Sequence, residues 1–576
     1  MQLPTWVRRA SPLAERLATY DRETLFNDLI GGSVVAVMLV PQAMAYAMLA
    51  GLPPQVGLYA SILPLILYAL FGSSNVLAVG PVAMVSLLVA SGVGTMATPG
   101  SAEYLSLCLT LAAMVGVIQI LMAMLKFGFL LNFISHPVIR GFTSAAAIVI
   151  AFSQLKYLLG IEVPQTELPY QTIVATLRSL PTIEWATFAI GLTSCGLLLA
   201  GSFALTPLLN RLGLSRFWAG ILPRFTPLIV VALGVAVISL FHWDTNRGVN
   251  IVGEIPSGLP RLTMPDFSID TLIKLGPLAL VIGLVGFLES YSVAKALAGR
   301  RREKVQPNRE MVALGIADLG ASITGGFPVT GGFSRSVVAE NAGIRTPMGS
   351  IITAIIVAVS VLLLPEYFHH IPRAVLAAII LVAVISLIDF RVPLGLWKFS
   401  RPDALAWLVT FVAVLFLGIE NGILAGIIAT AMLLMWRVSR PFVTKVGRIA
   451  GSEHFRNVDR FKVETHPDVI AFRVDASLIF ANAPFVEDYV LGLVADHPDV
   501  KSLLLIATGV NDIDATGIEL FNSLRLELHD AGVGFYLSDV KGPVTDRLRE
   551  AGFDETFMNC NLFLNADEAM KKLTSP

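Results

Sequence analysis

The feature that most constrains this chain is a succession of apolar segments, each long enough to cross a membrane. A bilayer core about 30 Å thick is spanned by about 20 apolar helical residues. Segments of this kind begin near Leu29, Leu58, Leu105, Ile139, Trp185, Pro227, Leu272, Ile351, Ala374, Leu405 and Ile423. With 55% hydrophobic and 14% charged residues, the composition excludes a wholly soluble enzyme, a disordered chain and a nucleic-acid binder. We therefore expect an α-helical polytopic membrane protein.

Two further apolar segments, 76–91 and 314–342, are shorter and are interrupted by Gly and Pro. The second contains a Gly-rich gap at 325–332, which predicts two short helices in place of one. Irregular backbone at membrane depth survives only where protein or a polar cavity covers it. With these short segments the expected total is about fourteen membrane passes.

The charged loops predict the orientation of the chain in the membrane. If the N-terminus is cytoplasmic, the loops on that side carry basic clusters such as those in 300–309 and 437–448, whereas the opposite loops carry few basic residues. An excess of Lys and Arg is typical of the cytoplasmic loops of membrane proteins. No apolar stretch follows the N-terminal arginines until about residue 29, so we expect no cleaved signal peptide. We predict a multi-pass protein of the cell membrane, inner or plasma, with both termini cytoplasmic, an N-terminal segment 1–24 and a transmembrane domain 25–440.

The two interrupted segments occupy matching places in two halves of this domain. Gln42 and Glu289 are 247 residues apart. Each is a single polar residue within an apolar predicted helix, and each is followed by an aromatic residue and small residues. The same offset relates Pro81 to Pro328, which lie in the two interrupted segments. Interrupted segments in corresponding places of two halves are the best sequence pointer to a transporter's binding site. The simplest interpretation is a seven-plus-seven inverted repeat.

The start of a half-helix suits an anion, because unpaired N–H groups and a partial positive charge face the ligand there. Residues 82–86, after Gly-Pro, fit one such start, and 334–336 fit the other. Ser334 is expected as the N-cap of the second half-helix, and Arg335 adds a fixed positive charge. The alternative for Arg335 is a snorkelling or loop arginine.

Glu289 lies next to an otherwise apolar run, 278–288. A carboxylate inside a membrane is costly and usually functional, often in proton or ion coupling. The alternative is a structural carboxylate paired with Lys295 or Arg335. For Gln42 the alternative is a hydrogen bond between helices, and Tyr46, one turn further on the same face, either lines the cavity or packs.

Two long motifs carry a resemblance to a known family. They are DLIGG from Asp28 with VPQAMAYAMLAGLPPQVGLY in 40–59, and GGFPVTGGFSRS in 325–336 with NAGIRTP in 341–347. Both motifs are similar to those of the SulP family of sulfate permeases and prestin-related anion transporters, and the resemblance covers nearly the whole chain.

The resemblance implies fourteen helices in two inverted sets of seven, divided into a core and a gate domain, with an anion site between the third and tenth helices. Glu289 matches an acidic position linked to cation coupling. Glutamate there resembles the proton-coupled sulfate carriers, whereas sodium-bicarbonate members more often have aspartate. The family is usually dimeric. The substrate-binding residues implied for this chain are Gln42, Tyr46, Pro81, Val82, Ala83, Ser334, Arg335 and Ser336.

After residue 448 the composition changes sharply. Residues 1–449 contain 30 basic and 21 acidic residues, a net charge of +9, whereas 450–576 contain 11 and 21, a net charge of −10. Apolar runs at 469–474, 502–507 and 534–538 predict strands, and 484–494, 517–530 and 544–551 have helical spacing. This alternation predicts a small cytoplasmic α/β domain at 459–576, after a linker at 441–458.

The loop 510–517, between a predicted strand and helix, resembles the Asp-x-Ser/Thr-Gly loop of STAS domains. In anti-sigma-factor antagonists the residue equivalent to Thr516 is phosphorylated, which makes Asp514 and Thr516 regulatory candidates. The alternative, which we favour, is that Thr516 is an N-cap and Asp514 a turn former.

The leading hypothesis is a secondary active transporter of sulfate or a similar small oxyanion, coupled to protons by alternating access, and not an enzyme. The alternatives are sodium-coupled bicarbonate or dicarboxylate transport, anion exchange or a passive channel, and a membrane sensor that signals through the STAS domain. The expected partners are a small inorganic anion, a proton or sodium ion, the lipid bilayer and a second copy in a homodimer. Three dispersed cysteines give no metal site, and we expect no cofactor and no nucleic acid.

Overall fold

The computed structural model describes residues 20–128, 135–164, 166, 168–213, 222–253, 258–260, 262–385, 387–553 and 560–575. Most of the predicted N-terminal segment 1–24 therefore lies outside the described residues. The chain divides into two compact units, Met1–Thr430 and Ala431–Pro576. We describe each unit by itself.

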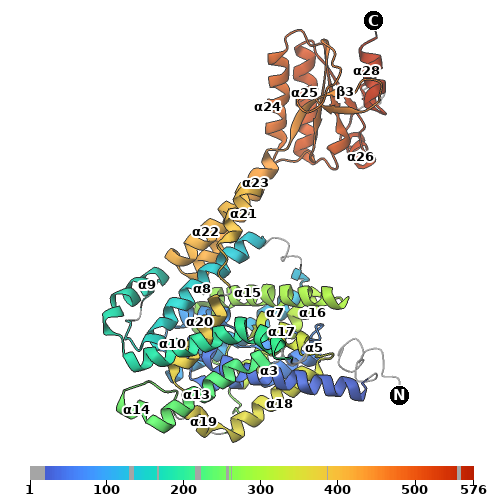
Figure 1. The fold of residues 1–576 in the computed structure, drawn as a ribbon. Helices are drawn as coiled ribbons and strands as arrows, with labels where there is room; N and C mark the ends of the chain where they lie inside the picture. The colour runs from blue at the N-terminus through green and yellow to red at the C-terminus, as the bar shows by residue number, and fades with distance from the viewer. Residues whose placement is uncertain are drawn as a thin grey trace. The chain divides into compact units, whose positions relative to one another are not determined.

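The first unit is built from helices (Figure 1). Among the described residues of the whole chain, seven helical spans are long and apolar enough to cross a membrane, and four shorter apolar helices accompany them. The helices of the first half are α3 (Arg22–Leu49), α4 (Pro54–Tyr59), α5 (Leu63–Phe71), α6 (Ala83–Val93), α7 (Ala102–Met124), α8 (His136–Leu159), α9 (Pro169–Arg178), α10 (Trp185–Ala200), α11 (Thr206–Arg211), α13 (Thr226–Phe241) and α14 (Trp243–Asn246).

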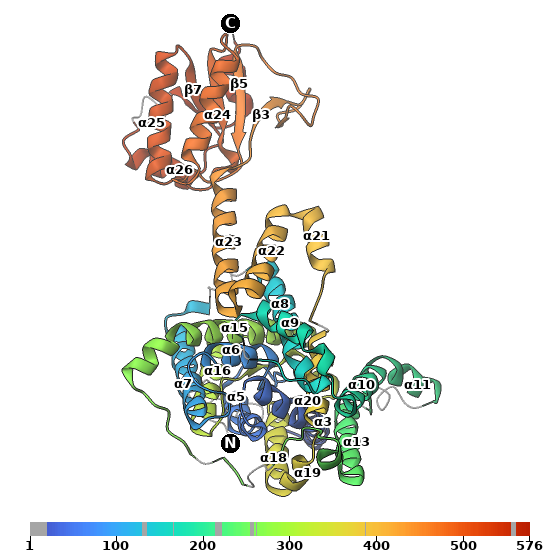
Figure 2. The ribbon, with the colours of Figure 1, turned by 90° about the vertical axis from the view of Figure 1, so that its left-hand side faces the viewer.

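The second half begins with α15, the longest of the described helices. Its helices are α15 (Ile269–Arg301), α16 (Pro307–Ile323), α17 (Phe333–Asn341), α18 (Met348–Leu363), α19 (Pro365–His369), α20 (Arg373–Ile385), α21 (Arg391–Phe399), α22 (Arg401–Leu417) and α23 (Ile419–Ser439). Helices α7, α15 and α16 pack side by side, and α8 packs on α20 and α22 (Figure 2). Helices from the two halves therefore interleave in each group. The predicted helical membrane protein is confirmed.

Each interrupted segment contains a two-residue strand followed by a short helix. β1 (Val79–Gly80) precedes α6, and β2 (Thr330–Gly331) precedes α17. The segment 314–342 thus contains two helices, α16 and α17, on either side of β2. This is what its Gly-rich gap predicted.

The two strands relate the halves to each other. β1 and β2 pair antiparallel, with Gly80 opposite Thr330, as expected of halves with opposite orientation. Helices α3 and α15 begin 247 residues apart, at the predicted offset. Helices α6 and α17, however, begin 250 residues apart, so Pro328 is not the counterpart of Pro81. The difference arises because the second half has three more residues before its half-helix.

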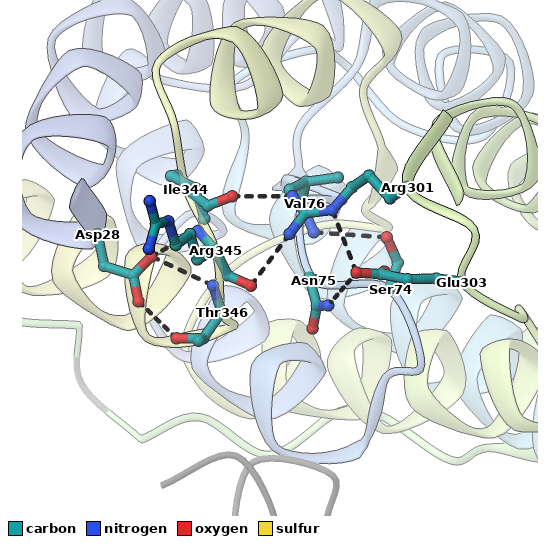
Figure 3. Close-up of polar contacts among 9 residues, drawn as sticks. All are labelled: Asp28, Ser74, Asn75, Val76, Arg301, Glu303, Ile344, Arg345 and Thr346. Carbon is teal, nitrogen blue, oxygen red and sulfur yellow. Dashed lines mark hydrogen bonds and ion pairs between the residues drawn. The ribbon is translucent and has the colours of Figure 1, made fainter. Parts of the chain in front are cut away.

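A buried carboxylate fastens the loop between α17 and α18 to α3 (Figure 3). Asp28 is fully buried. Its carboxylate accepts hydrogen bonds from the N–H groups of Arg345 at 2.7 Å and Thr346 at 3.2 Å, and from Thr346 Oγ1 at 2.5 Å. The Tyr20 hydroxyl donates another at 3.0 Å. Because a buried charge is stable only when it is well hydrogen-bonded, this cluster fixes the loop that follows α17.

A second polar cluster holds the same loop from α15 (Figure 3). Arg301 Nη1 donates to the Ile344 carbonyl at 2.9 Å, and Nη2 donates to the Arg345 carbonyl at 3.2 Å. Glu303 Oε1 accepts from Arg301 Nε at 3.1 Å and from Asn75 Nδ2 at 2.7 Å. Asn75 lies shortly before β1, which leads into α6, whereas the loop that Arg301 holds follows α17. The segment before one short helix is therefore joined to the segment after the other.

The second unit is a sheet with helices on both faces. In the described part of the chain the strand order is β4-β3-β5-β6-β7-β8, in which β5 to β8 are parallel and β3 is antiparallel to both of its neighbours. The three predicted strands correspond to β5, β6 and β7. The strand bounds are β3 (Val443–Arg448), β4 (Phe455–Asn457), β5 (Val469–Val474), β6 (Ser502–Ile506), β7 (Gly534–Ser538) and β8 (Leu562–Phe563).

Alternate strand residues point to opposite faces of this sheet. Leu505 belongs to a buried apolar cluster with Val490 of α24 and Phe521 of α25, whereas Leu504 belongs to a second cluster with Ala569 of α28. Figure 1 shows α24 and α25 on one face and α28 on the other. The helix bounds are α24 (Ala483–Asp496), α25 (Ala515–Asp530), α26 (Gly542–Glu550) and α28 (Ala566–Leu573). The predicted α/β domain is confirmed.

The range 441–458, expected as a linker, contains β3 and β4. β3 pairs with β5, and its Val446 is buried under α28. Arg448 forms an ion pair with Asp567 of α28 at 3.2 Å. The charged residues Lys445 and Arg448 obscure the apolar alternation of β3, and its partner β5 follows only after β4 and a further stretch of chain. The sheet therefore begins before residue 459.

Candidate anion site

One cavity in the first unit gathers most of the predicted site residues. It has a volume of about 330 Å³ and is lined by residues of α3, α6, α8, α15, α17, α20 and α23 and by the residues that precede α6 and α17. Pro81 and Ser336 are not part of its lining. The predicted residues that it brings together are Gln42, Tyr46, Val82, Ala83, Glu289, Ser334 and Arg335.

The N-termini of two short helices meet at this cavity. Val82 precedes α6 and Gly332 precedes α17, both with extended backbone and without a side-chain cap. The first N–H groups of each helix therefore have no partner within it, and they carry a partial positive charge. Ser334 was expected to be the N-cap of α17, which is wrong. It is the second helical residue and is exposed, because Gly332 takes the capping position.

Arg335 is almost fully buried, at 2% exposure, in the first turn of α17. Its Nη1 donates to the Pro81 carbonyl at 2.6 Å, whereas Nε and Nη2 have no hydrogen-bond partner in the described part of the chain. Gly332 makes room for this side chain, since a Cβ there would lie 2.8 Å from Nη2. The residue is therefore not a snorkelling or loop arginine, and two of its donor groups remain unused.

Glu289 lines the same cavity from α15. Its Oε2 is buried and has no hydrogen-bond partner among the described residues. Within the same residues no ion pair of 4.0 Å or less joins Glu289 to Lys295 or Arg335. Lys295 instead lies over the ring of Tyr291, with Nζ 5.8 Å from the ring centroid. The cavity thus contains one unpaired carboxylate and one guanidinium with unused donors.

Gln42 and Tyr46 line the cavity from α3, one helical turn apart. Both are mostly buried, with 4% and 8% of their surface exposed. Across the described residues the Gln42 amide has no hydrogen-bond partner on another helix, so the alternative of a helix-joining bond is not observed. Its amide is free to face a ligand.

Pro81 and Ser336 support the site from behind the lining. The Pro81 carbonyl accepts the hydrogen bond from Arg335. Ser336 Oγ donates to the Gly332 carbonyl at 2.7 Å and accepts from the Ala78 N–H at 2.9 Å. These bonds hold the start of α17 against the strand that leads into α6.

Sequence reasoning missed two polar residues and a whole wall of the cavity. Ser292 follows Glu289 by three residues, the helical spacing that places both on one face, so this spacing could have found it. Thr143, on α8, donates to the Ile139 carbonyl at 2.7 Å, and nothing in its local sequence marks it. The remaining wall is apolar and includes Val138, Phe142, Val384, Leu387, Ile423 and Ile427.

In the second unit the predicted regulatory loop leads into α25. Asp514 is the N-cap of this helix: Oδ1 accepts from the Gly517 N–H at 2.9 Å, and Oδ2 accepts from the Phe480 N–H at 2.8 Å. Thr516 is the second helical residue and is partly exposed. The capping role that the alternative interpretation gave to Thr516 therefore belongs to Asp514.

Comparisons with known proteins agree with this architecture. The profile of the sulfate permease family matches residues 25–410, and that of the STAS domain matches 460–569. The chain is 33% identical to sulfate transporter 4.1, chloroplastic, of Arabidopsis thaliana, over 99% of this chain and 83% of that one. It is 32% identical to the probable sulfate transporter Rv1739c of Mycobacterium tuberculosis, over 97% of each chain.

Solved structures share the fold. The murine Solute Carrier 26 family member A9 anion transporter in the inward-facing state has a TM-score of 0.91 at 24% identity, over 100% of this chain and 96% of that one. The transmembrane domain of the cyanobacterial bicarbonate transporter BicA has a TM-score of 0.58 at 25% identity, over 71% and 98%. Taken with the family match over residues 25–410, the cavity and the helical architecture show that the chain belongs to the sulfate permease family, as a multi-pass membrane anion transporter with a C-terminal STAS domain.

Proposed function

We propose that this protein imports sulfate or a similar small oxyanion together with a proton, by alternating access. The observation that carries the proposal is that Arg335 and Glu289 face one cavity at the N-termini of two helices, and that among the described residues Arg335 has unused donors and Glu289 has no partner. Relatives named as sulfate transporters support the choice of anion.

The charges around the cavity favour a divalent anion when Glu289 is protonated. Each helix N-terminus is equivalent to roughly half a positive charge, so α6, α17 and Arg335 together supply about two. An ionised Glu289 removes one of these, which leaves a balance suited to a monovalent anion. A dianion and a proton therefore bind more strongly together than apart, which is the thermodynamic requirement for symport.

The two walls of the cavity differ in a way that supports alternating access. Helices α3, α6, α15 and α17 supply the polar residues, whereas α8, α20 and α23 supply almost only apolar ones. An apolar wall forms no hydrogen bonds to an anion, so the polar wall can move past it with the anion still attached. We assign the polar wall to the core domain and the apolar wall to the gate.

Uptake of labelled sulfate into proteoliposomes tests this function. We expect an inward proton gradient to accelerate uptake by the wild-type protein. Glu289→Gln, which imitates the protonated carboxylate, should still carry sulfate but should not respond to the gradient. Asp270→Asn is a matched control, because Asp270 is exposed and, within the described residues, forms an ion pair only with Lys274 at the start of α15. Proton coupling is wrong if wild-type uptake ignores the gradient and Glu289→Gln behaves identically.

Sodium-coupled bicarbonate import is the second candidate, and the similarity to the transmembrane domain of the bicarbonate transporter BicA favours its choice of anion. Replacing sodium by choline separates the two, since only a sodium-coupled protein stops under that exchange. Anion exchange would require a counter-anion inside the vesicle, and a channel would give large currents that do not saturate.

We further propose that both termini are cytoplasmic and that the protein is a homodimer. Cys560 is exposed, whereas Cys108 and Cys195 are buried. A membrane-impermeant maleimide should therefore label inverted vesicles at Cys560 and leave intact cells unlabelled, and Cys560→Ser should abolish the labelling. Labelling of intact cells would place the C-terminus outside. The mass of the detergent-solubilised protein by light scattering tests the dimer.

A further inference from the structure

The helix that carries Glu289 is bonded to β2 through two buried hydroxyls. Ser290 Oγ and Thr330 Oγ1 lie 2.5 Å apart, and both residues are fully buried. Thr330 Oγ1 donates to the Gly286 carbonyl at 2.6 Å, and the Gly331 N–H donates to Ser290 Oγ at 2.7 Å. Because the Thr330 hydrogen is used on Gly286, Ser290 donates the bond between the two hydroxyls. The pair therefore has a single, fully satisfied arrangement.

This pair connects the two charged residues of the cavity. Glu289 directly precedes Ser290 on α15, and Arg335 lies four residues after Gly331 in the first turn of α17. No ion pair of 4.0 Å or less joins the two charges in the described part of the chain. The hydroxyl pair thus gives a bonded path from the helix of the carboxylate to the helix of the guanidinium.

The contact depends on close approach of α15 and β2. A Cβ on Gly286 would lie 3.3 Å from Thr330 Oγ1, tighter than an ordinary van der Waals contact. A buried hydrogen bond in a low-dielectric site is strong and costly to leave unmade, so this joint resists separation. Any displacement of α15 at this turn is therefore passed to β2 and to the start of α17.

We propose that Ser290 and Thr330 are positioning residues that transmit the protonation state of Glu289 to the anion-binding end of α17. The inference rests on the proton coupling proposed above. Neither hydroxyl lines the cavity, so neither contacts the anion or the side of the Glu289 carboxylate that faces the cavity. The two hydroxyls therefore affect how strongly protonation of Glu289 changes anion binding at α17, and they do not affect proton binding or anion binding taken alone.

Three variants separate this role from a merely structural one. Thr330→Val keeps the side-chain shape and removes both hydroxyl bonds, whereas Thr330→Ser restores them. Ser290→Ala removes the acceptor of the Gly331 N–H. The matched control is Thr353→Val, because Thr353 is equally buried and also joins two helices, donating to the Gly32 carbonyl at 2.9 Å, but far along the chain from Glu289.

The experiment measures sulfate uptake by the full-length protein in proteoliposomes, with and without an inward proton gradient, together with the KM for sulfate at zero gradient. We expect the gradient response of Thr330→Val and Ser290→Ala to fall by about fivefold, with the KM changed by less than about twofold. Thr330→Ser and Thr353→Val should keep the wild-type response. Gly286→Ala, which displaces Thr330 but keeps its hydroxyl, should give an intermediate response.

Two outcomes overturn the inference and are distinguishable. If the wild-type protein responds to the gradient and Thr330→Val responds equally, losing only total uptake as Thr353→Val does, the pair is structural. If the wild-type protein shows no response, the proposed proton coupling fails and this inference fails with it.

Discussion

At the scale of single residues, charge inside the membrane is what the sequence reveals most readily. Arg335 and Glu289 stand out because each is charged within an apolar context, and the structure puts both at one cavity. Ser334 was misplaced because the cap depends on the backbone of Gly332, which local sequence does not specify. Ser290 and Thr330 could not be predicted, since their importance lies in a contact across 40 residues.

Arg335→Ala should weaken sulfate binding by about 10- to 100-fold. The loss corresponds to roughly 1.5–3 kcal/mol, the usual strength of hydrogen bonds to a charged group. The measurement is the dissociation constant for labelled sulfate in detergent. Lys295→Ala, which removes an equal charge outside the cavity lining, is the control and should bind normally. Unchanged affinity in Arg335→Ala would mean that the helix ends hold the anion alone.

At the scale of elements, the helices and interrupted segments follow from apolar length and from Gly and Pro, which act locally. Their packing does not. Helices α7 and α16 cross where Gly116 and Gly315 face each other, and a Cβ on either would lie 2.6 Å from the carbonyl oxygen of the other. Small residues allow such close approach between membrane helices. Sequence alone shows these glycines but not their opposition.

Gly315→Ala should therefore destabilise the protein by about 1–3 kcal/mol, because the added methyl group forces the two backbones apart. Thermal denaturation in detergent measures the effect. Gly196→Ala on α10 is the control, since among the described residues no packing atom lies within 4 Å of the place that its methyl group would take. It should be neutral or stabilising by up to about 1 kcal/mol. Equal behaviour of the two variants would contradict close packing at Gly315.

Helix α28 and β3 are joined by a carboxylate that titrates at low pH. A hydrogen bond with Lys571, aided by Arg448, lowers the pKa of Asp567 from its ordinary value of 3.8. Because the folded pKa is depressed, the stabilisation is present above the unfolded pKa and is lost as the pH falls through the folded value. Asp567→Asn should therefore lower the unfolding temperature of the second unit at about pH 6, and this deficit should become smaller as the pH falls below the ordinary pKa, to about pH 3.

Circular dichroism of the full-length protein at both pH values gives this measurement. Asp530→Asn serves as the control, because Asp530 is exposed and its one ion-pair partner in the described part of the chain is His529. A deficit of Asp567→Asn that persists unchanged in acid would show that the carboxylate acts through its shape and not its charge.

At the scale of the whole molecule, the change of net charge near residue 449 predicts two units, and the structure divides the chain at Thr430. The predicted start of the second domain, residue 459, lies too far along the chain, because the charged residues of β3 make this strand resemble a linker. Its membership of the sheet depends on pairing with β5, about 25 residues further along the chain. Long-range pairing of this kind leaves little trace in local composition.

A fragment of residues 441–576 should therefore fold, whereas 459–576 should not. The shorter fragment lacks β3, so it exposes the edge of β5 and uncovers the apolar face under α28. Solubility and dispersed NMR spectra distinguish the two. A well-folded shorter fragment would show that β3 is an accessory to the sheet.

The pairing of β1 with β2 also has a consequence for synthesis, because the two strands leave the ribosome at different times. Gly80 and Thr330, opposite each other in the finished protein, are 250 residues apart in the chain. At ribosomal rates of about 5–20 residues per second, roughly 12 to 50 seconds separate their emergence. For that interval the nascent first half has a polar strand edge with no partner. We expect this to be the stage at which the unpaired strand must be kept from contact with lipid.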